Sequence, residues 1–344
     1  MAAVQEGREL AREEITRVVS LLAGDGASAE QKADFLAALA RKGETPDEIA
    51  GFAAELRALS VPLPFDSGGV GGEVLDVCGT GGDRLDTFNI STTVALVCAA
   101  AGVTVAKHGN RAVTSQSGSA DVLEALGIPV DLSPAEAARS LRDHRFAFLF
   151  APRFHPAFRN IGPARAVCAQ RGQRTLFNFL GPLLNPARPT AQILGVSRPE
   201  LVEPMARTLQ GLGLRRAMVV SGAVPGHGFL DELSTLGENT VAEFHHERGF
   251  SKSTWAPEGF ALIPAALADL RGGDRHANAA IIEGLLRGND AGPRRDAVLL
   301  NAGAALFVAG VARSIMEGWE QAADVLAVGK GWTMVESLRR FRRD

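Results

Sequence analysis

The sequence predicts an α/β fold: a large domain with a mainly parallel central sheet flanked by helices, plus a small all-helical N-terminal domain. Three observations lead to this prediction. Apolar residues recur at helical spacing over residues 7–60, a segment with two prolines and four glycines follows at 61–72, and short apolar runs then alternate with helical stretches. With 344 residues, 46% of them hydrophobic, the chain can bury a sizeable core.

The helical domain is expected over residues 1–70, with three or four short helices. A Gly-Asp-Gly turn at 24–26 ends one predicted helix, and Ser28 is placed to cap the next. Thr45 precedes Pro46 and two acidic residues, which is typical of the start of a further helix. The segment 61–72 then serves as the linker.

Residues 71–344 are expected to form the α/β domain. Helices between successive strands favour parallel pairing with right-handed crossovers. Ala-rich segments at 296–311 and 317–328 are predicted helices, and one more helix closes the chain. The predicted strands are residues 74–77, 103–106, 146–150, 191–196 and 216–220.

Composition disfavours several classes of partner. The 36 basic and 39 acidic residues nearly balance, so no overall field attracts nucleic acid. The longest apolar run, residues 94–101, is too short to span a membrane. Cys78, Cys98 and Cys168 form no C-x-x-C pair, which favours a reducing compartment and therefore a cytoplasmic location.

A glycine-rich turn after the first predicted strand is a candidate anion site. The motif D-V-C-G-T-G-G-D at 76–83 is followed by T-F-N-I-S-T at 87–92 and a helix predicted at 93–101. Backbone N–H groups and the positive helix end converge there. The turn lacks both the lysine of the nucleotide phosphate loop and the third glycine of the dinucleotide fingerprint. A plain turn before a capped core helix is the alternative.

A second polar loop, K-H-G-N-R-A-V-T-S-Q-S-G-S at 107–119, follows the next predicted strand. In open α/β folds, ligands bind at this edge of the sheet. Lys107 and Arg111 bring positive charge, and His108 and Asn110 bring directional hydrogen-bonding groups. The serines at 115, 117 and 119 can bind phosphate oxygens. A solvated loop without a ligand is the alternative.

Two further features complete the candidate site. Asp231 and Glu232 follow the predicted strand 216–220; if a diphosphate lies across the first two loops, such carboxylates can hold the cations that offset its charge. Arg165 comes just after Pro163, which can begin a helix, and its guanidinium could bind an aromatic carboxylate. Surface residues are the alternative for both. A tightly turned structural corner is predicted from Asn178, Gly181, Pro182, Asn185 and Pro186.

Several of these blocks, in this order, closely resemble the anthranilate phosphoribosyltransferase family. They are G-T-G-G-D at 79–83, N-I-S-T at 89–92, K-H-G-N-R at 107–111, S-G-S-A-D-V-L-E-A-L-G at 117–127, R-T-L-F-N-F-L-G-P-L-L-N-P at 174–186, and D-E-L at 231–233. The resemblance implies a nucleoside phosphorylase/phosphoribosyltransferase-like fold, with residues 165–190 contributing to the helical domain. It also implies a homodimer through that domain and an active site at the hinge.

The implied activity, within tryptophan biosynthesis, is transfer of the phosphoribosyl group of phosphoribosyl pyrophosphate (PRPP) to the amino group of anthranilate. Magnesium, as two ions per subunit, would bind Ser91, Asp231 and Glu232, and anthranilate would face Gly79, His108, Asn110 and Arg165. No general acid or base is assigned, because the aromatic amine is neutral near pH 7 and already nucleophilic. The residues implied to hold PRPP are Gly79, Gly82, Asp83, Thr87, Asn89, Ile90, Ser91, Thr92, Lys107, His108, Gly109, Asn110, Arg111, Ser115 and Ser119.

Two other functions remain open from the sequence. A pyrimidine nucleoside phosphorylase is similar in fold and also begins with a G-T-G-G turn, although its loops would not contain K-H-G-N-R. A non-catalytic relative that binds nucleic acid would need a basic face and loss of the loop residues. The segment between Arg165 and Arg174 is longer than the family pattern, so a longer helix is expected there.

Overall fold

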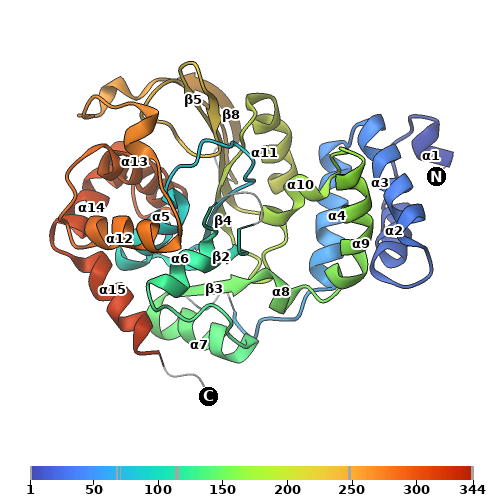
Figure 1. Cartoon of the computed structure of the whole chain (residues 1–344), viewed down its shortest axis with the longest axis horizontal. Coiled ribbons are helices and arrows are strands. Elements are labelled where there is room, and N and C mark those ends of the chain that lie inside the picture. The colour runs from blue at the N-terminus through green and yellow to red at the C-terminus, as the bar shows by residue number, and fades with distance from the viewer. Residues whose placement is uncertain (1, 67–68, 70, 113–115, 247–248, 342–344) are drawn as a thin grey trace.

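The computed structural model describes residues 2–66, 69, 71–112, 116–246 and 249–341. A layer of helices lies at one end of the molecule and an α/β sheet with its covering helices forms the rest (Figure 1). This arrangement confirms the fold class predicted from the sequence. No helix among the described residues is both long and apolar enough to cross a bilayer.

The N-terminal helices begin where their capping residues predict. Ser28 Oγ accepts a hydrogen bond from the Gln31 N–H, and Thr45 Oγ1 accepts one from the Glu48 N–H. Each cap satisfies an N–H group that has no partner within its helix. The four helices are α1 (Ala2–Gln5), α2 (Arg12–Ala23), α3 (Ala29–Lys42) and α4 (Pro46–Ala58).

A helix from the middle of the chain joins this layer. Helix α9 (Phe158–Gln170) packs against α2 and α3, and it lies beside the N-terminal helices in Figure 1. Lys32 Nζ donates to the carbonyls of Gly24 at 2.7 Å and Asn160 at 3.2 Å, and Asn160 Nδ2 donates to the Ala23 carbonyl at 2.7 Å. These bonds tie α9 to the turn after α2.

The central sheet has the strand order β3-β2-β1-β4-β5-β7-β8, and β6 pairs with β5. The first five strands of this order are parallel, as predicted, whereas β6, β7 and β8 pair antiparallel. The strands are β1 (Val74–Gly79), β2 (Thr104–Gly109), β3 (Phe146–Phe150), β4 (Ala191–Gly195), β5 (Arg216–Val224), β6 (Gly228–Leu230), β7 (Asn239–His245) and β8 (Gly249–Trp255).

The antiparallel edge was missed by the sequence prediction. Strand β8 reads G-F-S-K-S-T-W and is mostly exposed, so it contains no apolar run of the kind that marks a buried strand. The strand predicted over residues 216–220 continues to Val224, and the chain returns as β6. Pairing with a neighbouring strand, rather than local composition, makes these residues extended.

Both faces of the sheet are covered, and its strand side chains alternate between the two faces. Ile193 and Val220 face one apolar cluster, and their neighbours Leu194 and Val219 face the other. The remaining helices are α5 (Ile90–Ala100), α6 (Ser119–Ala125), α7 (Pro134–His144), α8 (Ala151–Phe154), α10 (Phe177–Leu180), α11 (Val202–Gly211), α12 (Arg275–Leu286), α13 (Pro293–Val308), α14 (Ile315–Ala327) and α15 (Lys330–Arg339).

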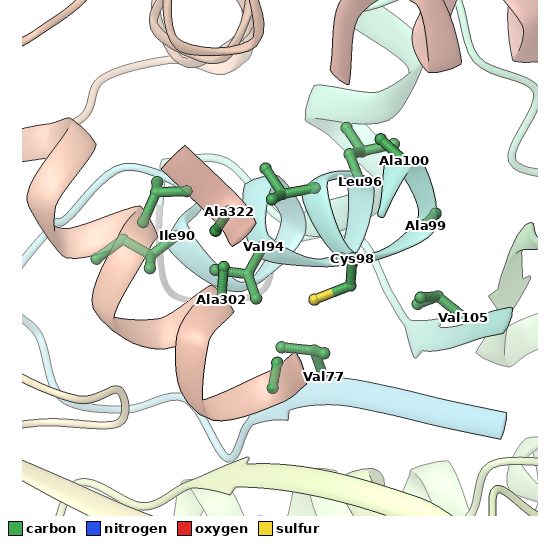
Figure 2. Packing of buried hydrophobic residues seen from close by; sticks show 14 of the residues in the cluster. Val77, Ile90, Val94, Leu96, Cys98, Ala99, Ala100, Val105, Ala302 and Ala322 are labelled. Atoms are coloured by element: carbon green, nitrogen blue, oxygen red, sulfur yellow. The ribbon is translucent and has the colours of Figure 1, made fainter. Parts of the chain in front are cut away.

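Helix α5 is buried on nearly every side, which its almost wholly apolar sequence requires. Figure 2 shows Val94 and Cys98 of α5 above Val77 of β1, with Ala302 of α13 and Ala322 of α14 around them. The small side chains of these alanines let α13 and α14 approach α5 closely. The packing fixes the N-terminal end of α5 at the carboxyl edge of β1.

The opposite face of the sheet packs against the helical layer. One apolar cluster contains Leu36 and Phe52 of the N-terminal helices, Ile161 of α9, and Leu194 and Val219 of the sheet. The helical layer and the sheet therefore share one continuous apolar core.

Candidate active site

Two adjoining cavities open where the parallel strands end. One, of about 580 Å³, is lined mainly by polar groups and is called the polar cavity below; the other, of about 560 Å³, contains several rings and is called the aromatic cavity. Both are lined by the ends of β1 and β2. The residues common to the two cavities are Cys78, Gly79, Thr80, His108, Gly109 and Asn110.

Nearly all of the predicted PRPP residues line the polar cavity. Ser115 lies outside the described residues, and Thr92 is buried behind the cavity wall, where its Oγ1 donates to Ser119 Oγ at 3.1 Å. The structure brings together here Gly79, Gly82, Asp83, Thr87, Asn89, Ile90, Ser91, Lys107, His108, Gly109, Asn110, Arg111 and Ser119. The glycine turn, residues 107–112 and 117–119 of the second loop, and the acidic pair thus line one space.

The first wall of the polar cavity is the start of α5. This helix begins at Ile90, so the prediction of a start at 93 was wrong: Ser91 and Thr92 belong to its first turn. The Ser91 N–H donates to Glu232 Oε1 at 3.2 Å, which places a carboxylate at the positive helix end. The Asn89 amide binds other residues, with Nδ2 donating to the Ser117 carbonyl and Oδ1 accepting from Asn278 Nδ2.

The end of β2 supplies a buried cation. Lys107 is 1% exposed, and its Nζ donates to the Val77 carbonyl at 2.6 Å and to Ser91 Oγ at 3.3 Å. Arg111 lines the same cavity, but its guanidinium forms a two-pronged pair with Glu124, both distances being 2.7 Å. The charge of Arg111 is thus already balanced by a carboxylate, whereas Lys107 lies directly under the cavity.

Ser117 is an orphaned polar group in this wall. Its Oγ is buried and has no hydrogen-bond partner among the described residues, and the residue lines the polar cavity. A buried hydroxyl without a partner costs free energy. A phosphate oxygen in the cavity would provide the missing partner.

The acidic pair closes the opposite side. Asp231 Oδ2 accepts a hydrogen bond from the Gly81 N–H at 2.7 Å. Burial, followed by the nearby Asp83 charge, raises the pKa of Asp231 to about 7, and burial with the Asp231 charge raises the pKa of Glu232. Carboxylates this close together favour a bound cation. No group of three or more His, Cys, Asp or Glu side chains within the described ranges is arranged to hold a metal by itself.

Gly195, which lies outside the predicted motifs, makes room for the acidic pair. It ends β4 and pairs in register with Gly79 of β1. A Cβ atom at Gly195 would overlap the main-chain carbonyl of Asp231, and one at Gly79 would overlap the Asp231 carboxylate. A glycine that ends a strand is a known mark of close backbone approach, so the signal was present in the sequence.

Asn301 of α13 holds the acidic segment from behind. It is 1% exposed; its Oδ1 accepts from the Leu233 N–H and its Nδ2 donates to the Leu233 carbonyl, both at 2.9 Å. The side-chain amide thereby satisfies both main-chain groups of the residue after Glu232. Sequence reasoning had no signal for this contact, because Asn301 lies within an ordinary Ala-rich helix.

The aromatic cavity contains the residues predicted to face anthranilate. Gly79, His108, Asn110 and Arg165 all line it. Arg165 lies on α9, with its guanidinium carbon 5.7 Å from the centre of the Phe177 ring. The prediction that Pro163 begins this helix was wrong, because α9 begins at Phe158 and contains Pro163 in its interior.

Rings form a continuous wall in this cavity. His155 contacts His108 and Phe158 edge to face, at 5.1 and 5.8 Å between ring centres, and Phe158 contacts Phe177 at 5.7 Å. Gly181 and Pro182 also line the cavity. They were interpreted as a purely structural corner, and the structure corrects this.

The two histidines are neutral near pH 7. Burial, together with the neighbouring His155, lowers the pKa of His108 to about 3, and burial lowers the pKa of His155 to about 4. His108 Nδ1 lies 3.2 Å from the Gly181 carbonyl, which can only accept, so Nδ1 carries the hydrogen. Its Nε2 lies 3.2 Å from Nε2 of His155. The fixed positive charge of this cavity therefore comes from arginine.

Comparisons with known proteins agree with this geometry. A family described as "Glycosyl transferase family, a/b domain" matches residues 71–332, and one described as "Glycosyl transferase family, helical bundle domain" matches residues 1–60. The anthranilate phosphoribosyltransferase of Roseiflexus castenholzii is 46% identical over 338 residues, which cover 97% of this chain and 95% of that protein.

Solved structures extend the comparison. The crystal structure of anthranilate phosphoribosyltransferase from Thermus thermophilus matches with a TM-score of 0.89 and 42% identity, covering 99% of this chain and 98% of that one. The Saccharomyces cerevisiae enzyme in complex with PRPP and Mg matches with a TM-score of 0.82 and 27% identity, covering 96% and 92%. The same yeast enzyme in complex with 4-fluoroanthranilate matches with a TM-score of 0.80 and 25% identity, covering 96% and 91%. The fold, the paired cavities and these relatives agree, and the chain belongs to the anthranilate phosphoribosyltransferase family.

Proposed function

We propose that this protein transfers the phosphoribosyl group of PRPP to the amino group of anthranilate, giving N-(5-phosphoribosyl)anthranilate and pyrophosphate in tryptophan biosynthesis. One observation carries the proposal: the polar cavity and the aromatic cavity share the wall formed by the ends of β1 and β2. A donor in one and an acceptor in the other would meet at Gly79, His108 and Asn110. The named relatives are enzymes of this kind.

PRPP would occupy the polar cavity. The glycine turn and the first turn of α5 line this cavity, the positive end of α5 favours an anion there, and Ser117 and Ser119 offer hydroxyls. Lys107 supplies positive charge from below, through a side chain fixed by two hydrogen bonds. These groups would hold the diphosphate and the ribose in a defined orientation relative to the shared wall.

Magnesium would be held by Ser91, Asp231 and Glu232. The fit rests on the excess of carboxylate at this cavity and on the two buried acids whose charges are offset only in part by Lys107. Magnesium commonly uses one or two carboxylates and takes its other ligands from phosphate and water. When bound, it neutralises the charge that develops on the departing pyrophosphate. The yeast relative in complex with PRPP and Mg supports magnesium use, and two ions per subunit stay a prediction.

Anthranilate would occupy the aromatic cavity. Its ring would lie among Phe158, Phe177 and Pro182, and its carboxylate would pair with Arg165. Asn110 and His108 would orient the amine toward the shared wall. The amine attacks C1 of the ribose as the bond from C1 to pyrophosphate breaks, and its proton is then lost. Positioning accounts for this step, so no general base is assigned.

Three other inferences belong to this proposal: the division into two units, the homodimer and the cytoplasmic location. The division into a helical unit of residues 1–70 with a contribution from about 165–190 and an α/β unit of 71–344 is supported by the packing of α9 on α2 and α3. A homodimer through the helical unit and a cytoplasmic location stay predictions. The two alternative functions, a pyrimidine nucleoside phosphorylase and a nucleic-acid-binding relative, find no support among the named relatives.

The direct test follows the fluorescence of anthranilate. The signal should fall when PRPP and magnesium are added together with the protein, and it should stay constant when either is left out. A parallel reaction with a pyrimidine nucleoside and phosphate should release no base. Release of base without any consumption of anthranilate would instead support the phosphorylase alternative and overturn this proposal.

A further inference from the structure

A buried carboxylate beneath the shared wall has no part in the chemistry described so far. Asp76 lies within β1 and is 0% exposed. Its Oδ1 accepts from the His108 N–H at 3.3 Å, and its Oδ2 accepts from Asn185 Nδ2 at 2.9 Å. A buried carboxylate is costly unless it is hydrogen-bonded, and an apolar side chain would fill the same place without that cost. What the carboxylate adds is a connection between elements.

Asn185 is the second half of this connection. It is 1% exposed, and its Nδ2 donates to the Ala106 carbonyl at 2.7 Å as well as to Asp76. Its Oδ1 accepts from the Ala187 N–H at 2.9 Å. The amide thus joins the segment after α10 to both β1 and β2, with its donors and its acceptor all in use.

Gln192 makes a second attachment of the same segment. Its side chain on β4 is 1% exposed, and its Nε2 donates to the Pro182 carbonyl at 2.8 Å. The wall formed by Gly181, Pro182 and Leu184 is therefore held to the sheet at two points. Asp76, Asn185 and Gln192 are not among the residues that line either cavity.

The held segment meets His108 from the other side. Asp76 accepts from the main-chain N–H of His108, while the Gly181 carbonyl accepts from its ring. The ring orientation of His108 and the position of Pro182 thus depend on one hydrogen-bonded unit. A shift of this unit would move the aromatic cavity, whereas the start of α5 and the acidic pair on the polar side are held by other contacts, including Asn301.

We propose that the Asp76–Asn185 hydrogen bond positions the anthranilate-binding side of the site. It sets the separation between strands β1 and β2 and the segment 181–184, which lines the aromatic cavity. This inference rests on the proposed function, because anthranilate is taken to be the occupant of that cavity. Asn185 is a positioning residue that acts through Gly181 and Pro182, which line the aromatic cavity and not the polar cavity. Removing its amide loosens the binding of anthranilate and leaves the binding of PRPP unchanged.

The experiment compares three variants with the wild type. Asn185→Ala removes the connection; Asn301→Ala removes a buried amide that supports the polar side; Ser140→Ala removes a buried hydrogen bond to Phe146 at the far end of β3. The KM for anthranilate, the KM for PRPP, kcat and the melting temperature are measured for each. Ser140→Ala controls for general loss of stability.

Asn185→Ala is expected to raise the KM for anthranilate about ten-fold or more, because small misplacements of a binding wall have large effects. The KM for PRPP should stay within about two-fold. Asn301→Ala should show the reverse pattern, with the KM for PRPP raised. Ser140→Ala should lower the melting temperature and change neither KM.

Each outcome supports or overturns the positioning role of Asn185. An equal rise in both KM values for Asn185→Ala, or an unchanged KM for anthranilate, overturns the positioning role. If Asn185→Ala does not fold, Gln192→Met decides in its place. It removes the bond to Pro182 together with a weaker contact to Cys78 Sγ at 3.2 Å, and it should give the same KM pattern. A wild-type protein that consumes no anthranilate overturns the proposed function instead, so the two failures are distinguishable.

Discussion

Four acidic residues line the polar cavity, Asp83, Asp86, Asp231 and Glu232, and the ammonium of Lys107 lies beneath the cavity. Burial raises the pKa values of the Asp231 and Glu232 carboxyls because water no longer stabilises their charges. A divalent cation would offset this charge. The function of these residues therefore depends on their charge rather than on their shape.

Replacing Glu232 with glutamine keeps its shape and removes its charge. We expect kcat/KM to fall about 100-fold or more, because less charge remains to hold the cation that stabilises the departing pyrophosphate. Steady-state assays over a range of magnesium concentrations measure this loss. Glu317→Gln, a like change at the start of the distant α14, should stay within about two-fold. Full activity of Glu232→Gln at saturating magnesium would contradict the assignment.

The histidine pair predicts a pH dependence of stability. Since the folded-state pKa values of His108 and His155 are lowered to about 3 and 4, the unfolded chain takes up these protons first as pH falls below 6.5. Each ring then lowers the free energy of unfolding by about 2 kcal/mol at pH 5 relative to pH 7. The raised pKa values of Asp76 and Asp231 have the opposite effect, because they increase the free energy of unfolding as pH falls. The histidine effect is therefore measured as the difference between the wild type and a variant that lacks one histidine.

Urea unfolding of the wild type and of His155→Gln at pH 7, 6 and 5 provides this difference. From pH 7 to pH 5, the free energy of unfolding of the wild type should fall by about 2 kcal/mol more than that of the variant. A gap that stays constant over this range would mean that His155 is not buried in its neutral form.

At the scale of elements, the site depends on how closely the acidic segment approaches the sheet. The ends of β1 and β4 carry Gly79 and Gly195 side by side, and the main chain of Asp231 lies against both. Asn301 of α13 then fixes the next residues. Two strands and one helix, far apart in the sequence, thus place one pair of carboxylates.

Gly195→Ala tests this arrangement. The added methyl group would overlap the Asp231 carbonyl, so the segment must move. We expect a destabilisation of about 1–3 kcal/mol and a fall in kcat/KM of about 100-fold. Gly284→Ala is the matched control, because a Cβ atom there meets no atom within 4 Å and the residue lies inside α12. The control should be neutral or stabilising by up to about 1 kcal/mol. Unchanged activity in Gly195→Ala would exclude the close approach.

At the scale of the whole molecule, the helical layer and the sheet share an apolar core. Leu36 and Phe52 of the helical layer belong to the same cluster as Leu194 and Val219 of the sheet. Separating the two would expose apolar surface on both, which costs free energy in proportion to its area. The two regions matched by separate family descriptions are therefore expected to unfold together.

Equilibrium unfolding measures this coupling. Trp255, Trp319 and Trp332 all lie outside residues 1–60, so tryptophan fluorescence reports the α/β part, whereas far-UV circular dichroism reports all helices. We expect the two transitions to have the same midpoint. An earlier loss of circular dichroism without a change of fluorescence would show that the helical layer unfolds by itself.

The sequence by itself determined the features that depend on neighbouring residues. The five parallel strands, the caps at Ser28 and Thr45, and the two polar loops after β1 and β2 all follow from short patterns. Parallel strands that end at one edge bring such loops together, so the gathering of the PRPP residues around one cavity could also be expected. The need to offset the charge of a diphosphate, together with the family resemblance, linked Asp231 and Glu232 to these loops; sequence spacing did not.

Only the tertiary structure decided the rest. The exposed strand β8 contains no apolar run that could have predicted it. Helix α9 begins at Phe158 rather than at Pro163, and it packs on α2 and α3. Gly181 and Pro182 line a cavity, which their turn-forming sequence does not indicate. The supports at Asn185, Gly195 and Asn301 contact residues distant in the chain. Local patterns encode backbone preferences and burial, whereas these contacts depend on which atoms folding brings within hydrogen-bond distance.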